Sequence, residues 1–226
     1  MDKNASLLPF AYPKVASWTG EKNHDCCFWD GVKCDKESGL VIALHLNSSC
    51  LYGSINSTST LFQLSQLRIL DLTDNDFNHS QVPSTLGNLS QLKYLNLEWS
   101  GFAGSIPSSI GFEQPPAALP LFRLKILFLD NNMLQGSLPF LPPSILNYDL
   151  PNNKLSGEVS PLFCNLSSIQ YNSLGHNKLS GMLPACLKNL SNSLLALSLV
   201  NNSFYGSTPE ICINGSQLIV ESASSA

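Results

Sequence analysis

The stretch LKILFLDNNMLQGSLP, from Leu124 to Pro139, contains the pattern that decides the fold. Apolar residues stand three and five residues after Leu124, Asn132 stands eight after it, another apolar residue ten and Gly136 twelve. Seven copies of this pattern occur, and we expect an eighth; their first residues are Val41, Leu67, Leu92, Leu124, Ile145, Ile169, Leu194 and Leu218. One spacing therefore organises nearly the whole sequence.

Successive copies are 26, 25, 32, 21, 24, 25 and 24 residues apart, which is the period of leucine-rich repeats. The L-x-x-L-x-L portion alternates like a short strand, so its leucines face one side and the intervening residues face the other. One repeat cannot bury its leucines alone, but coils stacked about 4.8 Å apart build a parallel sheet over a continuous core. We predict an α/β-type leucine-rich-repeat solenoid, a curved right-handed superhelix with its parallel β-sheet on the concave face.

Asparagine and glycine hold fixed places in the pattern. The asparagine follows the strand, where its amide can satisfy backbone groups that the bend leaves unpaired, and the glycine allows a bend that a side chain would obstruct. We interpret as structural the asparagines Asn75, Asn132, Asn153, Asn177 and Asn202. Ser49 and Ser100 replace this asparagine, and Asn172 stands at an expected core position, so we predict that the sixth repeat is locally weak.

The chain divides into a terminal unit and an array of repeats. Residues 1–40 form an N-terminal cysteine-containing cap, incomplete at its start, that would cover the leucines of the first coil. Residues 41–217 hold about seven repeats, and residues 218–226 begin an incomplete one. The segment GFEQPPAALPLFR, residues 111–123, lengthens one repeat. We expect a loop on the convex side or flank, with a miscalled intron as the alternative.

Composition excludes several classes of function. Of the 226 residues, 43% are apolar, which is ample for a core, and only 12% are charged, with a net charge of −4. A strongly basic, phosphate-binding surface is not expected, so nucleic acid is not a predicted partner. No apolar run reaches the roughly 18 residues that cross a bilayer, and no secretion signal opens the sequence.

Two features indicate an oxidising, extracellular compartment. The sequence has seven cysteines, and its N-x-[ST] sequons are more frequent than chance would give. We expect most of them to be glycosylated on exposed loops, although the repeat itself could place Asn and Ser at these offsets. The sequons are at Asn4, Asn47, Asn56, Asn78, Asn88, Asn165, Asn189, Asn201 and Asn214.

The residues also carry a resemblance to a known family. The x-G-x-[IL]-P element in SGFAGSIPSSIG (residues 100–111) and NKLSGMLPACLKNLS (177–191), with the cap ASWTGEKNHDCCFWDGVKCD (16–35), resembles the plant-specific class of leucine-rich repeats. The stretch HLNSSCLYGSINSTSTLFQLSQLRILDLTDNDFN (45–78) is similar to the first repeats of plant receptor-like proteins. The chain resembles the N-terminal part of such an ectodomain, and a truncated product is the alternative.

Members of this family are single-pass cell-surface receptors of defence and development that rely on partner receptor kinases. The resemblance therefore implies a location on the extracellular side of the plasma membrane, a peptide or protein ligand and a receptor kinase co-receptor. We expect neither a signal peptide nor a transmembrane helix within this chain.

In the cap, the resemblance implies a disulfide between Cys27 and Cys34. It pairs Cys26 with a cysteine upstream, in a segment that this sequence lacks, so Cys26 would stay unpaired or divert to Cys50. A zinc site that used His24 and the three cap cysteines would have adjacent ligands and no second C-x-x-C pair, so we predict no metal.

In the repeats, Cys164 and Cys186 follow Pro161 and Pro184 closely, which places them near each other on adjacent coils. Cys212 could compete for Cys186 by the same geometry. The family pattern favours the bond between Cys164 and Cys186.

Catalysis finds no support in the sequence. The four histidines fall in unrelated positions of the coil, and no nucleophile, base and orienting group recur at usable spacing. The glycines follow the repeat and not a phosphate-binding loop. We predict a protein that is not an enzyme and needs no cofactor.

Binding is favoured because residues between the strand leucines point outward in register. Four carboxylates and several aromatic residues share the expected concave face, which would suit a peptide or protein with basic and apolar groups. The candidate contacts are Asp71, Thr73, Tyr94, Asn96, Glu98, Trp99, Phe128, Asp130, Asp149 and Tyr171. The competing interpretation is that exposed strand positions are polar in any soluble protein.

We therefore predict a noncatalytic extracellular recognition module of the receptor-like-protein class. The alternatives are a soluble secreted inhibitor of a pathogen cell-wall-degrading enzyme, of the polygalacturonase-inhibitor type, and a nonfunctional truncated fragment.

Overall fold

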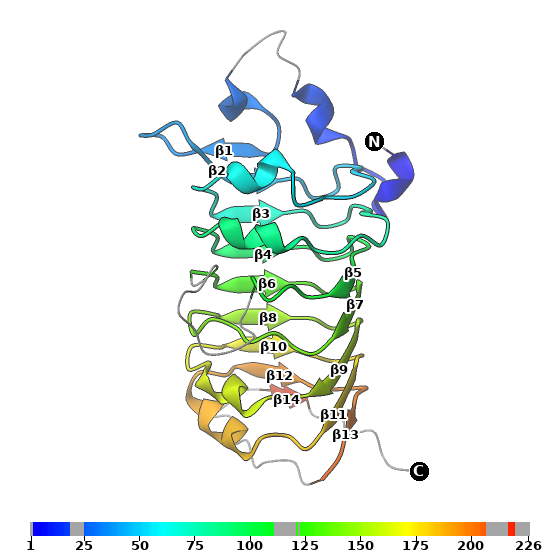
Figure 1. Ribbon diagram of the computed structural model, residues 1–226, viewed down its shortest axis with the longest axis vertical. Helices are drawn as coiled ribbons and strands as arrows, with labels where there is room; N and C mark the ends of the chain where they lie inside the picture. Colours follow the sequence, from blue (N-terminus) through cyan, green and yellow to red (C-terminus); the bar gives the residue numbers. More distant parts are fainter. Residues whose placement is uncertain (1, 19–24, 111–120, 122, 207–216, 220–226) are drawn as a thin grey trace.

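The computed structural model describes residues 2–18, 25–110, 121, 123–206 and 217–219. It is the leucine-rich-repeat solenoid that the sequence predicts. Coils stack along one axis, and each contributes a strand to a sheet that runs the length of the molecule (Figure 1). The helices that return the coils are 3-10 helices throughout the described residues.

The main sheet has nine strands in the order β1-β2-β3-β4-β6-β8-β10-β12-β14. Neighbours are parallel except β1 and β2, which pair antiparallel at the N-terminal cap. Most strands have three residues, because each coil bends soon after its central leucine. Their bounds are β1 Val32–Cys34, β2 Val41–His45, β3 Ile69–Asp71, β4 Tyr94–Asn96, β6 Ile126–Phe128, β8 Asn147–Asp149, β10 Tyr171–Ser173, β12 Ala196–Ser198 and β14 Gln217–Ile219.

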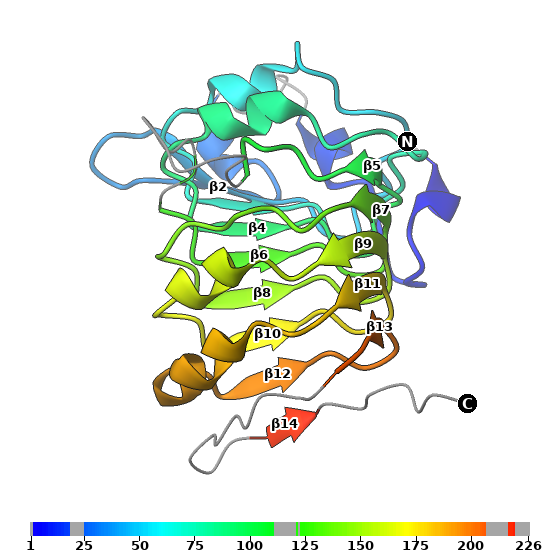
Figure 2. The same ribbon diagram turned by 60° about the horizontal axis from the view of Figure 1, so that its bottom comes forward.

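A second parallel sheet lies beyond the C-terminal ends of the main strands (Figures 1 and 2). The sequence pattern does not predict this sheet, because its residues stand at the bends and in the peripheral extended segments of the repeat. The two NKLSG stretches of the sequence supply β9 and β11. In the order of the sheet, the strands are β5 Ala103–Ser105, β7 Met133–Gly136, β9 Lys154–Glu158, β11 Lys178–Gly181 and β13 Ser203–Phe204.

Short 3-10 helices complete the coils, and η6 and η7 lie on the side where the main strands begin (Figure 2). Pro83 and Pro184 precede η5 and η7, and Pro161 is the first residue of η6. Proline suits these places because the first N–H groups of a helix have no partner within it. The helices are η1 Lys3–Ala5, η2 Lys14–Ser17, η3 Cys26–Phe28, η4 Thr60–Gln63, η5 Ser84–Asn88, η6 Pro161–Asn165 and η7 Ala185–Asn192.

The repeat leucines form one continuous core. Leu67, Leu92 and Leu124, the first leucines of three successive repeats, are all 0% exposed. Phe77 and Phe102 stack with ring centroids 4.7 Å apart and continue this core outward from the main sheet. Because burying one such side chain is worth roughly 1.5–3 kcal/mol, stacking of the coils accounts for most of the stabilisation.

The N-terminal cap covers the first coil with aromatic side chains. Trp18 and Trp29 stack with ring centroids 5.3 Å apart, and Trp18 packs against the core. The indole N–H of Trp18 donates to the carbonyl oxygen of Asp30 at 2.9 Å, which fixes the ring. A terminal unit of this kind removes the leucine face of the first coil from water.

Asparagine side chains join each coil to its neighbour. Asn132 donates to the carbonyl oxygens of Leu97 in the preceding coil and Leu129 in its own coil, at 2.8 and 3.0 Å, and accepts from the N–H of Phe102 at 2.9 Å. Equivalent bonds are made by Asn75, Asn153, Asn177 and Asn202. We call these five residues the asparagine ladder; their predicted structural role is confirmed.

The eighth repeat begins earlier than the sequence analysis placed it. Leu218 pairs with Leu197, which stands three residues after Leu194, the first residue of the seventh repeat. Leu218 therefore occupies the second apolar position and not the first. The prediction was wrong because Gly215, which has no side chain to bury, stands where the pattern requires a leucine-like residue. Most of the insertion at residues 111–123 lies outside the described residues.

Two polar side chains interrupt the core on neighbouring strands. Tyr148 in β8 and Asn172 in β10 pair in register at positions where other coils have leucine. Tyr148 is 0% exposed and Asn172 is 3% exposed. Among the described residues, the hydroxyl of Tyr148 and both amide atoms of Asn172 find no hydrogen-bond partner. A buried polar group in this state costs about 1–3 kcal/mol, so the structure places an energetic cost in the sixth repeat.

Replacing Asn172 by leucine should stabilise the protein by about 1–3 kcal/mol, because it removes two unsatisfied polar atoms and restores the leucine pattern. Tyr148→Phe should be neutral or mildly stabilising, because the ring keeps its volume. Urea unfolding of the full chain measures both effects.

Asn153→Leu is the matched control, because Asn153 is a buried asparagine with all its bonds made. It should destabilise by at least about 1–3 kcal/mol, since partners in two coils lose their bonds. If Asn172→Leu lowered stability as Asn153→Leu does, the interpretation of Asn172 as a defect would be wrong.

Candidate functional site

The outward strand residues form columns across the concave face. One column reads His45, Asp71, Asn96, Phe128, Asp149, Ser173 and Ser198. The column two residues further along reads Asn47, Thr73, Glu98, Asp130, Pro151, Gly175 and Val200. Because adjacent strands lie about 4.8 Å apart, residues of neighbouring coils in one column can contact the same ligand group.

Four of the predicted contact side chains pair with each other: Asn96 with Tyr94, and Asp71 with Thr73. Asn96 is only 6% exposed, accepts from the N–H of Glu98 at 2.9 Å and donates to the hydroxyl of Tyr94 at 3.3 Å. The carboxylate of Asp71 accepts from the N–H and hydroxyl of Thr73 at 3.1 and 2.7 Å. Asn96 therefore supports the surface from beneath and exposes little of its side chain, and its contact with a ligand stays a prediction.

Aromatic side chains stand beside the acidic residues. Tyr94 and Phe128, on the adjacent strands β4 and β6, meet edge to face with ring centroids 6.0 Å apart. Trp99 is 46% exposed and Tyr171 is 42% exposed. Tyr171 lies on β10, three strands from Tyr94, so it extends the surface but does not join this pair. Tyr94, Phe128 and Trp99 therefore stand on the same two coils as Glu98 and Asp130.

Trp99 adopts a backbone conformation that suits small polar residues better. Its φ is +50°, in the left-handed region. Its counterparts in the other coils share this conformation and are Ser48, Asp74, Asn131, Asn152, His176 and Asn201. Asparagine and aspartate tolerate the region, whereas a bulky residue there is strained. The fold therefore holds an exposed indole at the rim of the concave face at a cost in energy.

The carboxyl groups of Glu98, Asp130 and Asp149 form an acidic cluster. Burial and the neighbouring Asp130 raise the pKa of Glu98 from 4.5 to about 7, although bonds from Asn96 and Trp99 oppose the shift. Burial also raises the pKa values of Asp130 and Asp149. Near neutral pH, Glu98 and Asp130 therefore hold a proton more readily than exposed carboxyls do.

The sequence analysis missed a row of basic residues on the same sheet. Arg68, Lys93 and Lys125 each stand just before or at the start of a main strand on successive coils, and all three are exposed. The signal was available, because each directly follows the first leucine of its repeat. The concave face is therefore basic where its central strands begin and acidic where they end.

The structure contains the two disulfides that the resemblance implied. Cys27 is bonded to Cys34, and Cys164 is bonded to Cys186 across η6 and η7, with Cα atoms 5.4 and 5.9 Å apart. The sulfur of Cys26 lies within 4.8 Å of the sulfurs of Cys27 and Cys34. Because that pair is oxidised, its thiolates are not available to a metal.

Cys26 and Cys50 do not pair with each other. Cys26 is half-buried and Cys50 is buried, and both are free thiols, so the alternative bond between them is not formed. Cys212 and His24 lie outside the described residues.

Comparison with known proteins agrees with this architecture. A family model for the leucine-rich-repeat N-terminal domain matches residues 4–35, and a model for the leucine-rich repeat matches residues 66–89. Receptor-like protein 6 of Arabidopsis thaliana is 34% identical over 234 residues, which cover 90% of this chain and 23% of that protein. The chain is a leucine-rich-repeat protein related to the plant receptor-like proteins.

Two solved structures share the fold of this receptor-like chain. The crystal structure of PEPR1–AtPEP1 superposes with a TM-score of 0.79 at 30% identity, covering 92% of this chain and 28% of that one. The second is the ectodomain of the Arabidopsis membrane receptor kinase GASSHO1/SCHENGEN3, in complex with CASPARIAN STRIP INTEGRITY FACTOR 2. It gives a TM-score of 0.66 at 27% identity, covering 89% of this chain and 26% of that one.

The chain spans less than a quarter of the length of the curated relatives it matches. Within the described residues, no helix has the length and hydrophobicity needed to span a bilayer.

The sequons of the receptor-like chain lie in different environments. Asn47 is half-buried, and its side chain accepts from the ammonium group of Lys14 at 3.0 Å. Asn88 and Asn165 are exposed at the last residues of η5 and η6. The other exposed sequon asparagines are Asn4, Asn56, Asn78 and Asn201. The side chain of Asn189 and the whole of Asn214 lie outside the described parts, and glycosylation stays a prediction at every site.

The raised pKa of Glu98 predicts a pH-dependent stability. A carboxyl whose pKa is raised by folding stabilises the protein fully below its unfolded pKa of 4.5, and this contribution is lost as the pH rises through 7. The glutamine of the Glu98→Gln variant cannot ionise. The melting temperature of this variant should therefore be about 2 °C above that of the unmodified protein at pH about 8, and the two should be equal at pH about 4. Asp130→Asn should behave in the same direction. An equal difference in melting temperature at both pH values would contradict the assignment.

Proposed function

We propose that this chain is a noncatalytic recognition module that binds a peptide or protein carrying basic and apolar side chains. The grouping of Glu98, Asp130 and Asp149 beside Tyr94 and Phe128 on one face carries the proposal. No lysine or arginine is among the main influences on the pKa values of these three carboxyls. Burial and neighbouring carboxyls raise these pKa values, so a ligand cation would meet carboxyls whose ionisation it favours.

The binding mode follows from the positions of these groups. An arginine or lysine of the ligand would place its charged end between Glu98 and Asp130 and its aliphatic stem against Tyr94 and Phe128. Trp99, held at the rim, would add an apolar contact that needs little ordering. Because a bound cation favours ionised carboxyls, binding would displace protons, and affinity should rise as the pH rises toward neutrality.

The relatives support the setting of this activity. One is named a receptor-like protein, and one structural neighbour is a receptor kinase ectodomain in complex with its factor. We propose that the whole protein acts on the extracellular side of the plasma membrane, in defence or developmental signalling, with a receptor kinase as its partner.

Charge reversal at Glu98 and Asp130 together should weaken binding of synthetic lysine- and arginine-rich aromatic peptides at least about tenfold. The matched control reverses Glu37 and Glu158, which are exposed elsewhere, so the net charge of both variants is equal. Calorimetric titration of the full chain with the same peptides measures the difference. Equal losses in both variants would reduce the effect to net charge and sink the proposed site.

A further inference from the structure

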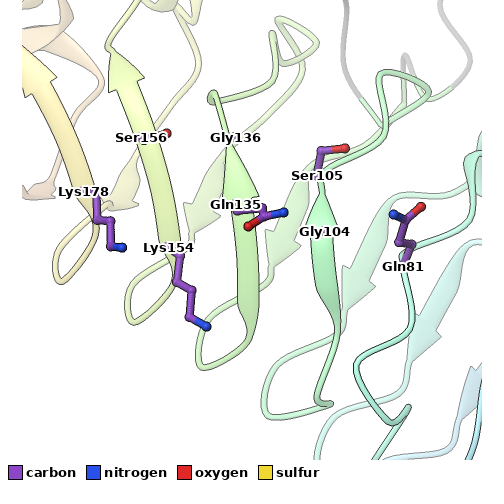
Figure 3. A pocket seen from close by; sticks show the side chains of 8 residues that line it. All are labelled: Gln81, Gly104, Ser105, Gln135, Gly136, Lys154, Ser156 and Lys178. Carbon is purple, nitrogen blue, oxygen red and sulfur yellow. The ribbon is translucent and has the colours of Figure 1, made fainter.

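A polar groove crosses the second sheet (Figure 3). This sheet lies to one side of the main strands (Figure 2). Its volume is about 510 Å³, and it spans the coils that contain β5, β7, β9 and β11. The side chains that line it are those of Gln81, Ser105, Gln135, Lys154, Ser156 and Lys178, and Gly104 and Gly136 contribute backbone. No carboxylate and no aromatic ring is part of this lining.

Glycine and strand register together shape the groove. Gly104 and Gly136 have φ values of +78° and +85°, which side chains rarely adopt, so the floor there is bare backbone. Within the second sheet, Lys154 of β9 pairs with Gln135 of β7, and Lys178 of β11 pairs with Ser156 of β9. Each lysine therefore pairs with a residue that stands two positions later in the repeat of the preceding coil. This offset places the lysine beside an amide or a hydroxyl of that coil.

The polar groups of the groove are free to bind a ligand. Among the described residues, the six lining side chains make no hydrogen bond or ion pair, either with one another or with the rest of the chain. The ammonium groups of Lys154 and Lys178 extend from neighbouring strands toward the same side (Figure 3). The groove therefore presents two unpaired positive charges, two amides and two hydroxyls along the axis of the solenoid.

We propose that this groove binds an acidic polysaccharide, a linear chain of hydroxyl-rich sugars that carry carboxylates. Lys154 and Lys178 would pair with carboxylates of nearby sugars, while Gln81, Gln135 and the serines exchange hydrogen bonds with sugar hydroxyls. Because no aromatic ring offers a stacking surface, affinity depends on charge and falls with salt.

An acidic peptide fits the groove less well. Within the sheet, β7, β9 and β11 are paired on both sides, and the outer side of β5 already makes a bridge between Ala103 and Gln81, so the floor offers a peptide little room to add as a further strand. The lining also has no apolar pocket for peptide side chains. The proposal does not depend on the concave face, which lies on another side of the coil, so either function can fail alone.

The test uses the full chain with oligogalacturonate, a linear polyuronate, as the probe in calorimetric titration. Binding is expected at about 0.01 M salt and should weaken about tenfold or more at about 0.15 M, where the Debye length is roughly 8 Å. The double variant Lys154→Gln and Lys178→Gln should lose at least about tenfold in affinity. Lys188→Gln, at an exposed lysine on η7, is the control and should bind as the unmodified chain does.

Three results would overturn the proposal: no binding of the polyuronate at low salt, equal loss in the Lys188 variant, or polyglutamate bound as tightly as the polyuronate. Circular dichroism and melting temperatures of the variants show that a lost affinity is not lost folding. The concave variants at Glu98 and Asp130 should retain polyuronate binding, which separates this proposal from the proposed peptide recognition.

Discussion

The hydrogen bonds of the asparagine ladder are the interaction on which the rest of the structure depends. Each ladder amide joins backbone groups of two successive coils at the bend that follows the main strand. Asn132, for example, bonds to Leu97 and Phe102 of the preceding coil and to Leu129 of its own. Only a side chain with two donors and an acceptor can serve all of these groups. The ladder thereby fixes both the stacking of the coils and the angle between the two sheets.

The two sheets give the molecule surfaces of different chemistry. At the centre of the concave face, acidic groups lie beside aromatic rings, whereas the groove on the second sheet combines lysines with neutral hydrogen-bonding groups. The flank of 3-10 helices carries exposed sequons at Asn88 and Asn165. Glycans at these two sites would cover that flank and leave the centre of the concave face and the groove open to ligands.

The core shows what the repeat tolerates. Tyr148 and Asn172 occupy leucine positions on neighbouring strands, yet the strands on either side keep their register. The stacked coils hold these two residues in place, because the asparagine ladder and the neighbouring leucines fix each coil. An isolated coil with the same substitutions would lack that support, since a repeat contacts only its neighbours and draws its stability from them.

The sequence by itself determined the repeat frame, the buried leucines, the asparagine ladder and the outward columns, because these follow from local periodicity within one coil. The burial of groups on neighbouring coils and their effect on each other's pKa values were beyond it. Glu98 and Asp130 are 32 residues apart in sequence, across the insertion, and share a cluster only because the strands stack. The stagger that brings Lys154 beside Gln135 belongs to the second sheet, whose register does not follow from the spacing of the repeats. Which residues become neighbours across coils depends on loop lengths and strand register, and only the packing of the coils decides these.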